Sequence, residues 1–355
     1  MGTNIFAFII VLGILIFFHE LGHFIIARLF GVGVEKFSLG FGPKLIYKKI
    51  GITEYCISAI PLGGFVKMVG EEPNTKIDPE QIPFSFTHKH VLKRILIVAA
   101  GPLFNLLLAV VIFFFLFLIY GNFVLKPVIG EVLDTGPAKS SGLKSKDLVV
   151  AVNGSDIKTW NEMVDYITIS KGQPLVFSVI RDESLLEIKI KPELKSSKNI
   201  FGEDINRYII GVKSSGAVKS IKLGLVDSFK ESLVQSYKII ELTFKTIIKL
   251  IQGTVSTKTL GGPIMIAEMA GQQAREGIPN LTFFIALLSI HLAIMNFLPI
   301  PVLDGGHLLF FTIEAIIGRP VNKKMQEIAQ QGGIFLLILL MVWVFYNDIE
   351  RIFFS

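Results

Sequence analysis

Long apolar segments alternate with polar ones along this chain. Crossing a bilayer core of ~30 Å takes roughly 20 helical residues, and four segments match or approach that length: Ile5–Phe30, Ile95–Tyr120, Leu281–Leu298 and Ile328–Ile349. Residues 122–215, between the second and third segments, are much more polar and contain one short helical stretch, Trp160–Ile169. β-rich runs separated by glycine-containing turns surround that stretch; they are Val128–Leu133, Leu148–Val152, Leu175–Ile180 and Leu185–Ile190. The pattern predicts a polytopic α-helical membrane protein with four transmembrane helices and an inserted soluble α+β domain.

The remaining segments follow other patterns. Residues 34–70 alternate in short runs between glycines, which predicts β-hairpins; they form either a small cytoplasmic meander or a strand edge beside a functional site. Ile221–Gln252 has apolar residues at three- and four-residue steps, with lysines between them. That is an amphipathic helix, lying on the membrane or packing under the soluble domain. We therefore expect four regions: 1–121, 122–215, 216–280 (including the Gly/Pro-rich Leu260–Gly271) and 281–355.

Composition supports a membrane protein and argues against other classes. Hydrophobic residues make up 51% of the chain, too many for an ordinary soluble protein. The net charge of +6 fits lysines and arginines flanking membrane spans, and no aromatic-plus-basic pattern indicates nucleic-acid binding. The single cysteine, Cys56, excludes an intramolecular disulfide. The first apolar segment lacks a basic start and a cleavage site, so we expect it to be a retained span.

The first apolar segment contains the string His19-Glu20-Leu21-Gly22-His23. Ionisable residues are costly in hydrocarbon and usually face a cavity, a partner or an ion there. On a helix, residues four apart share a face, so His19 and His23 can bind one metal ion while Glu20 reaches a water beside it. This is the H-E-x-x-H pattern of zinc proteases.

A catalytic zinc needs a third protein ligand, and Asp304 is the first candidate. It follows a proline-broken helix end after the third apolar segment, and the alternative is that it caps the next helix before two glycines. His307 ranks second, whereas His291 is expected to pack or hydrogen-bond. Lysine and arginine bias places the Gly31–Arg94 segment and residues 319–324 in the cytoplasm. The soluble domain and both termini are then outside, and all three ligands fall near the cytoplasmic side.

Three motifs together resemble the site-2 protease family of intramembrane zinc metalloproteases, of the bacterial RseP type. They are the string at 19–23, Gly101-Pro-Leu-Phe-Asn105, and residues 296–307 (Asn-Phe-Leu-Pro-Ile-Pro-Val-Leu-Asp-Gly-Gly-His). The resemblance implies that His19, His23 and Asp304 bind Zn²⁺ and that Glu20 is catalytic. It also implies a membrane-associated β-hairpin region at 34–70 and a single extracytoplasmic PDZ domain at 122–215, where residues 142–154 resemble a PDZ string.

The resemblance further implies cleavage within transmembrane segments of single-span membrane proteins, such as anti-sigma factors or remnant signal peptides, in the bacterial inner membrane. Substrate contacts are expected from Asn296 and, in the β-hairpin region, from Gly64 and Phe65. The PDZ domain is expected to bind substrate C-termini or exclude them. Competing classes are a non-catalytic membrane PDZ scaffold, a zinc transporter and a membrane-anchored zinc protease with a cytosolic site.

Overall fold

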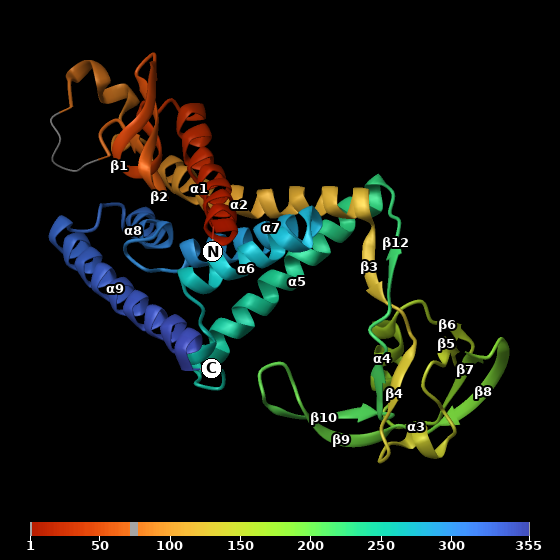
Figure 1. Cartoon of the computed structure of the whole chain (residues 1–355). Helices are drawn as coiled ribbons and strands as arrows, with labels where there is room; N and C mark the ends of the chain where they lie inside the picture. The colour runs from red at the N-terminus through yellow and green to blue at the C-terminus, as the bar shows by residue number, and fades with distance from the viewer. Residues whose placement is uncertain (1, 72–76, 355) are drawn as a thin grey trace. The chain divides into compact units, whose positions relative to one another are not determined.

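The computed structural model describes residues 2–71 and 77–354, which form two compact units. One unit comprises 2–116, 229–245 and 256–354 within that described part, and the other comprises 117–228 and 246–255. Figure 1 labels helices and strands of both units.

The first unit is largely helical. Its helices are α1 (Gly2–Leu29), α2 (Val91–Tyr120, to residue 116), the middle of α5 (Leu225–Ile251), α6 (Pro263–Glu276), α7 (Ile278–Phe297), α8 (Asp304–Ile317) and α9 (Lys323–Phe354), with short 3₁₀ turns at Pro79–Phe84 and Thr257–Thr259. Among the described residues, four helices are long and apolar enough to span a membrane: α1, α2, α7 and α9. The four apolar helices expected from the sequence are therefore present.

Local sequence explains where these helices stop. The chain leaves α1 through Gly31, whose φ of +67° is readily adopted only by glycine. Gly277, at φ +117°, separates α6 from α7, and Pro279 occupies the first turn of α7, where its missing N–H costs nothing. Helix α7 ends before Pro299. A short turn, in which Leu303 N–H donates to the Ile300 carbonyl, leads into α8.

Strands β1 (Val34–Ile50) and β2 (Thr53–Met68) follow α1, forming two long strands where the sequence predicted short hairpins. Their register is irregular, because residues 36–39 pair with 54–57 and also with 64–67. Among the described residues, 64–67 pair only with this first part of β1 and so form a sheet edge. Phe37 of β1 packs edge-on against Phe17 and Phe24 of α1, which fixes the sheet to that helix.

Two apolar clusters hold the helices of this unit together. One joins α1, the sheet and the start of α2 through residues that include Ala27, Val66 and Ile97. The other joins α1, α2, α6 and α7 through residues that include Val11, Leu108, Ala270 and Phe284. Helices α2 and α7 lie side by side, with the ring of Phe113 5.3 Å from that of Phe283.

The second unit has the composition and core of a soluble domain. Its strands are β3 (Asn122–Leu125), β4 (Ile129–Val132), β5 (Leu148–Val152), β6 (Ser155–Asp156), β7 (Leu175–Arg181), β8 (Ser184–Ile190), β9 (Glu193–Lys198), β10 (Asp204–Ile209), β11 (Val212–Ser214) and β12 (Val218–Ile221). The order β6-β5-β7-β8 makes one sheet, and β10-β9, β11-β4 and β12-β3 pair separately. The helices are α3 (Pro137–Ser140) and α4 (Trp160–Ile169).

Helix α4 has the bounds that its sequence predicts. Thr159 caps it in a capping box with Glu162, the Thr-x-x-Glu signal of a helix start. Met163 and Ile167 then point into a core that includes Phe177 and Val149. Because β12 pairs with β3, the chain of this unit continues past residue 215.

Candidate metal centre

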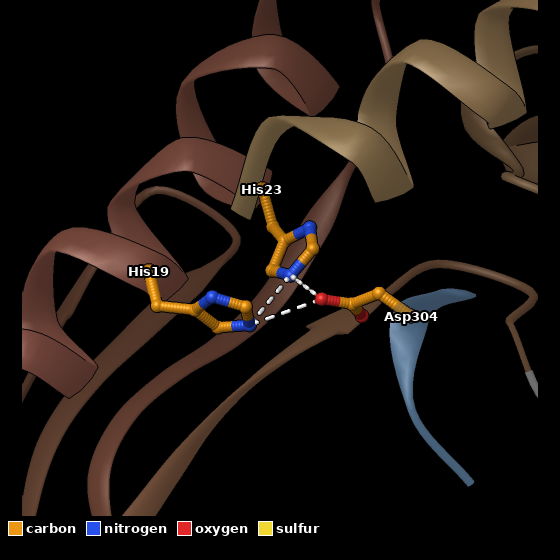
Figure 2. A group of neighbouring side chains, drawn as sticks. All are labelled: His19, His23 and Asp304. Atoms are coloured by element: carbon orange, nitrogen blue, oxygen red, sulfur yellow. Dashed lines mark hydrogen bonds and ion pairs between the residues drawn. The ribbon is translucent and has the colours of Figure 1, made fainter. Parts of the chain in front are cut away.

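Three side chains from two helices converge at one point of the helical unit. His19 and His23 lie one turn apart on α1, and Asp304 is the first residue of α8 (Figure 2). The ligand atoms of all three lie within 4.8 Å of one another. The two Nε2 atoms are 3.3 Å apart, and Asp304 Oδ2 lies 3.2 Å from His19 Nε2 and 3.6 Å from His23 Nε2. Neither His307 nor His291 belongs to this group.

The donor atoms of this group fit a metal ion. Asp304 Oδ2 is buried and makes no geometrically acceptable hydrogen bond within the described part of the chain, although both imidazoles lie close to it. A buried carboxylate oxygen without a hydrogen bond is costly unless a cation satisfies it. Two imidazole nitrogens and one carboxylate oxygen are a ligand set that zinc accepts in catalytic sites, with a fourth position left open. The residues present therefore fit zinc.

The nitrogen of His23 that faces away from the group is held by the backbone. His23 Nδ1 lies 2.9 Å from the Ile97 carbonyl of α2, to which it donates. A proton on Nδ1 leaves the lone pair of Nε2 free for a metal, the usual arrangement around metal-binding histidines. Helix α2 thus orients this imidazole by a direct contact.

The imidazole of His19 faces Asn105, which is fully buried in α2. Asn105 Nδ2 lies 3.5 Å from His19 Nδ1, and Asn105 Oδ1 has no hydrogen-bond partner among the described residues. The backbone carbonyl of Asn105 accepts a 2.7 Å hydrogen bond from Ser289 of α7. Asn105 ends one of the three motifs noted in the sequence, but the sequence could not indicate that its side chain faces His19.

Glycines make the close approach of these helices possible. A Cβ atom on Gly101 of α2 would collide with the rings of both His19 and His23, and one on Gly22 of α1 would collide with the Ala100 carbonyl. Next to Asp304, Gly305 and Gly306 lie directly against the backbone of residues 297–301. These glycines therefore set the distance between the elements that carry the three polar residues.

Asp304 does not cap α8, so the capping interpretation considered from sequence is wrong. The N-cap residue of α8 is Leu303, and no side chain makes a capping hydrogen bond there. The first helical turn instead carries the Asp304 carboxylate toward the histidines. A negative charge in the first turn of a helix is also favoured by the helix dipole.

Glu20 lies beside the β-sheet edge. Its side chain is buried, and a Cβ on Gly64 would come within 3.1 Å of Glu20 Cγ. The next residues on that edge are Phe65, whose ring stacks on Phe41 at 6.0 Å, and Val66. The edge formed by residues 64–67 therefore runs directly past the glutamate.

The predicted substrate residues come from two elements, Gly64 and Phe65 from β2 and Asn296 from α7. Gly64 is adjacent to Glu20, whereas the Phe65 ring packs within the sheet, with Lys36 Nζ 5.0 Å from its centre. Asn296 is in the last turn of α7 and is half-buried. His307, one turn along α8 from Asp304, has its ring centre 6.5 Å from that of Phe311.

The chain matches the model of peptidase family M50 over residues 7–340. It is 33% identical to the zinc metalloprotease RasP of Geobacillus kaustophilus, over 99% of this chain and 98% of that protein. It is 38% identical to "Putative zinc metalloprotease Cj1068" of Campylobacter jejuni, over 98% of this chain and 93% of that protein. The chain therefore belongs to peptidase family M50, the site-2 protease family, as the three motifs predicted.

Solved structures match part of the chain. The PDZ domain of the SdrC-like protein from Listeria monocytogenes is 22% identical, covering 24% of this chain and 84% of that structure, with a TM-score of 0.21. The solution structure of a Geobacillus thermodenitrificans protein, GtR34C, is 24% identical, covering 20% of this chain and 80% of that structure, with a TM-score of 0.18.

Proposed function

We propose that this protein is a zinc-dependent intramembrane endopeptidase in which His19, His23 and Asp304 bind the metal and Glu20 is the catalytic base. The observation that carries the proposal is the convergence of two imidazoles and a carboxylate whose buried Oδ2 atom makes no hydrogen bond within the described part of the chain. It lies in a family M50 chain with membrane-length helices. Zinc held there supplies a Lewis acid that polarises the scissile carbonyl and acidifies water.

Glu20 is placed to move a proton between water and the leaving nitrogen. Glu20 directly follows His19 on α1. It therefore lies beside the two imidazoles without belonging to the ligand group. Its carboxylate can accept a proton from the attacking water and later deliver it to the departing amine.

The substrate class follows from the apolar setting and from the sheet edge. A transmembrane helix satisfies its own backbone hydrogen bonds, so its peptide carbonyls are shielded until it unwinds locally. The sheet edge at residues 64–66 passes Glu20, and an extended substrate would add to it as a further strand. We infer that substrates are single-span membrane proteins with a helix-destabilised stretch, which Gly64, Phe65 and Asn296 contact during cleavage.

The proposal also includes a location in the membrane and a role for residues 122–215. Lysine and arginine bias places the site near the cytoplasmic side of a bacterial inner membrane, with the 122–215 region outside. That region acts as a PDZ domain that binds or excludes substrate C-termini. The roles in anti-sigma factor or signal-peptide processing rest on the family resemblance.

Metal analysis combined with cleavage of a transmembrane reporter tests the proposal. Purified wild-type protein should contain one zinc per chain and cut the reporter, whereas Glu20→Gln should keep the zinc and lose cleavage by at least about 10³-fold. Wild-type zinc binding without reporter cleavage by either form would favour a zinc transporter. A wild-type chain with neither zinc nor cleavage would favour a PDZ scaffold.

A further inference from the structure

A partly buried ion pair joins the start of α2 to α8. Arg94 Nη2 lies 2.5 Å from Glu314 Oε1, and the two side chains are only 11% and 16% exposed. The guanidinium carbon of Arg94 also lies 4.8 Å from the centre of the Phe311 ring, and Arg94 Nε donates to the Lys89 carbonyl at 3.1 Å. These contacts give the guanidinium one orientation between the two helices.

Stability alone gives little reason for charges at this position. Removing two ions from water costs several kcal/mol per ion, and a well-packed apolar pair is often as stable as a buried ion pair. What a charged, hydrogen-bonded pair adds is a defined geometry, because it tolerates small displacements poorly. The position of α8 relative to α2 is therefore restricted more narrowly than apolar packing would require.

The same part of α2 already holds one of the metal-group residues. Ile97, three residues after Arg94, is fully buried, and its carbonyl accepts the hydrogen bond from His23 Nδ1. The start of α2 therefore contacts α1 directly at His23 and contacts α8 through Arg94. The start of α2 therefore contacts both of the helices that carry the three residues of the metal group.

Helix α8 transmits this restraint to Asp304. Glu314 lies ten residues after Asp304 on one uninterrupted helix, which is about 15 Å of α-helix. At the first turn of α8, Gly305 and Gly306 lie in close contact with the backbone of residues 297–301. Leu308 and Phe311 add apolar packing midway along the helix. A second fixed point at Glu314 prevents α8 from pivoting about the two glycines.

We propose that Arg94 and Glu314 are positioning residues that hold Asp304 at the distance from His19 and His23 that zinc binding requires. The inference deepens the proposed function and rests on it, since it takes these three residues as the zinc ligands. Neither Arg94 nor Glu314 touches the metal or the substrate. Their effect is on how well the third ligand is oriented before the metal arrives.

The test is the zinc dissociation constant of the full-length protein in detergent micelles, measured by competition with a chelating dye. Glu314→Gln removes one charge, and the double variant Arg94→Met with Glu314→Leu removes both, so that no unpaired charge stays buried. Both should bind zinc at least about tenfold more weakly than wild type, the scale of losses seen when residues supporting metal ligands are replaced. The double variant keeps the test valid if Glu314→Gln folds poorly.

A matched control separates positioning from stability. Arg181→Gln breaks a buried ion pair with Asp147 in the other unit, so it should lower the melting temperature and leave zinc affinity unchanged. Zinc affinities of Glu314→Gln and the double variant within about twofold of wild type would overturn the inference. An equal loss of zinc affinity in Arg181→Gln would also overturn the inference. If the wild-type protein binds no zinc, the proposed function fails. If the wild type, Glu314→Gln and the double variant all bind zinc with the same affinity, only the positioning role of Arg94 and Glu314 is refuted.

Discussion

Two aspartates with buried carboxylate oxygens, one in each unit, are held in opposite ways. Asp147, fully buried in the soluble-type unit, accepts hydrogen bonds from Arg181 Nε and Nη2, each at 2.7 Å, and from the Lys144 backbone at 2.8 Å. Asp304 in the helical unit faces two imidazoles, and its Oδ2 has no hydrogen-bond partner within the described part of the chain. The first carboxylate is neutralised by protein, and the second is arranged for a cation that the protein does not provide.

The comparison shows that burial of a carboxylate does not by itself identify a functional site. Buried polar groups in folded proteins are almost always satisfied, and the exceptions need an explanation. Asp147 is such a satisfied group and has a structural role between β5 and β7. Asp304 and Asn105 are exceptions, and both lie beside His19, Asp304 at its Nε2 and Asn105 at its Nδ1. The site in the helical unit differs because buried polar atoms without hydrogen bonds lie beside side chains that can bind a metal ion.

The largest expected effect comes from removing the unsatisfied carboxylate. Asp304→Ala leaves two imidazole ligands, so the purified protein should lose its zinc and its cleavage of a transmembrane reporter. Zinc content by elemental analysis checks this. His307→Ala is the matched control, because His307 lies on the same helix outside the ligand group, and it should keep its zinc. Full zinc occupancy in Asp304→Ala would remove Asp304 from the ligand set.

Removing the satisfied carboxylate should affect a different property. Asp147→Ala leaves the Arg181 guanidinium, 21% exposed, without its ion partner, which should lower the unfolding free energy of that unit by about 3 kcal/mol. Chemical denaturation followed by near-ultraviolet circular dichroism measures the loss. Zinc content should stay at the wild-type value. Zinc loss in this variant at temperatures where it remains folded would contradict the separation of the two roles.

Replacing Asn105 should have a smaller effect on the metal. A zinc-bound His19 needs a hydrogen-bond acceptor at Nδ1, and a half-turn of the Asn105 amide places Oδ1 there. Asn105→Leu should therefore weaken zinc binding about tenfold. Asn105→Asp keeps an acceptor and should bind zinc more tightly than the leucine variant. Equal zinc affinities for the two variants, measured by chelator competition, would show that the acceptor is not what matters.

The smallest effect is expected for an ion pair at the surface. Lys213 Nζ and Glu131 Oε2 lie 2.9 Å apart between β11 and β4, and both side chains are more than half exposed. Glu131→Gln should change the unfolding free energy by about 0.5 kcal/mol or less, because exposed pairs are weak and screened. The same denaturation measurement as for Asp147 applies. A loss as large as that of Asp147→Ala would show that burial is not the deciding factor.

The sequence predicted the helices and the family well, because those features depend on local patterns. Apolar length identified the four membrane-length helices, and the short helical stretch predicted at Trp160–Ile169 is α4. The spacing of His19 and His23 placed them on one helical face. Strands β9 and β10 were missed, because residues 193–209 are mostly polar and their pairing is not visible as alternating apolar positions.

Long-range contacts could not be predicted in the same way. The approach of Asp304 to α1 depends on a turn after Pro299 and on glycines whose close contacts only appear once the helices are packed. The partners of His23 and Arg94 are a backbone carbonyl and a glutamate 220 positions away in sequence. No periodicity encodes either contact, since both arise from how α1, α2 and α8 pack together.

X-ray absorption at the zinc edge of the loaded full-length protein tests the central claim most directly, because it reports the donor atoms themselves. The account predicts only nitrogen and oxygen donors at ~2.0–2.2 Å, including two imidazoles, with the oxygen contribution reduced in Asp304→Ala reloaded at high zinc concentration. A sulfur donor at ~2.3 Å, which only Cys56 or a methionine could supply, would contradict it. A spectrum unchanged by Asp304→Ala would contradict it as well.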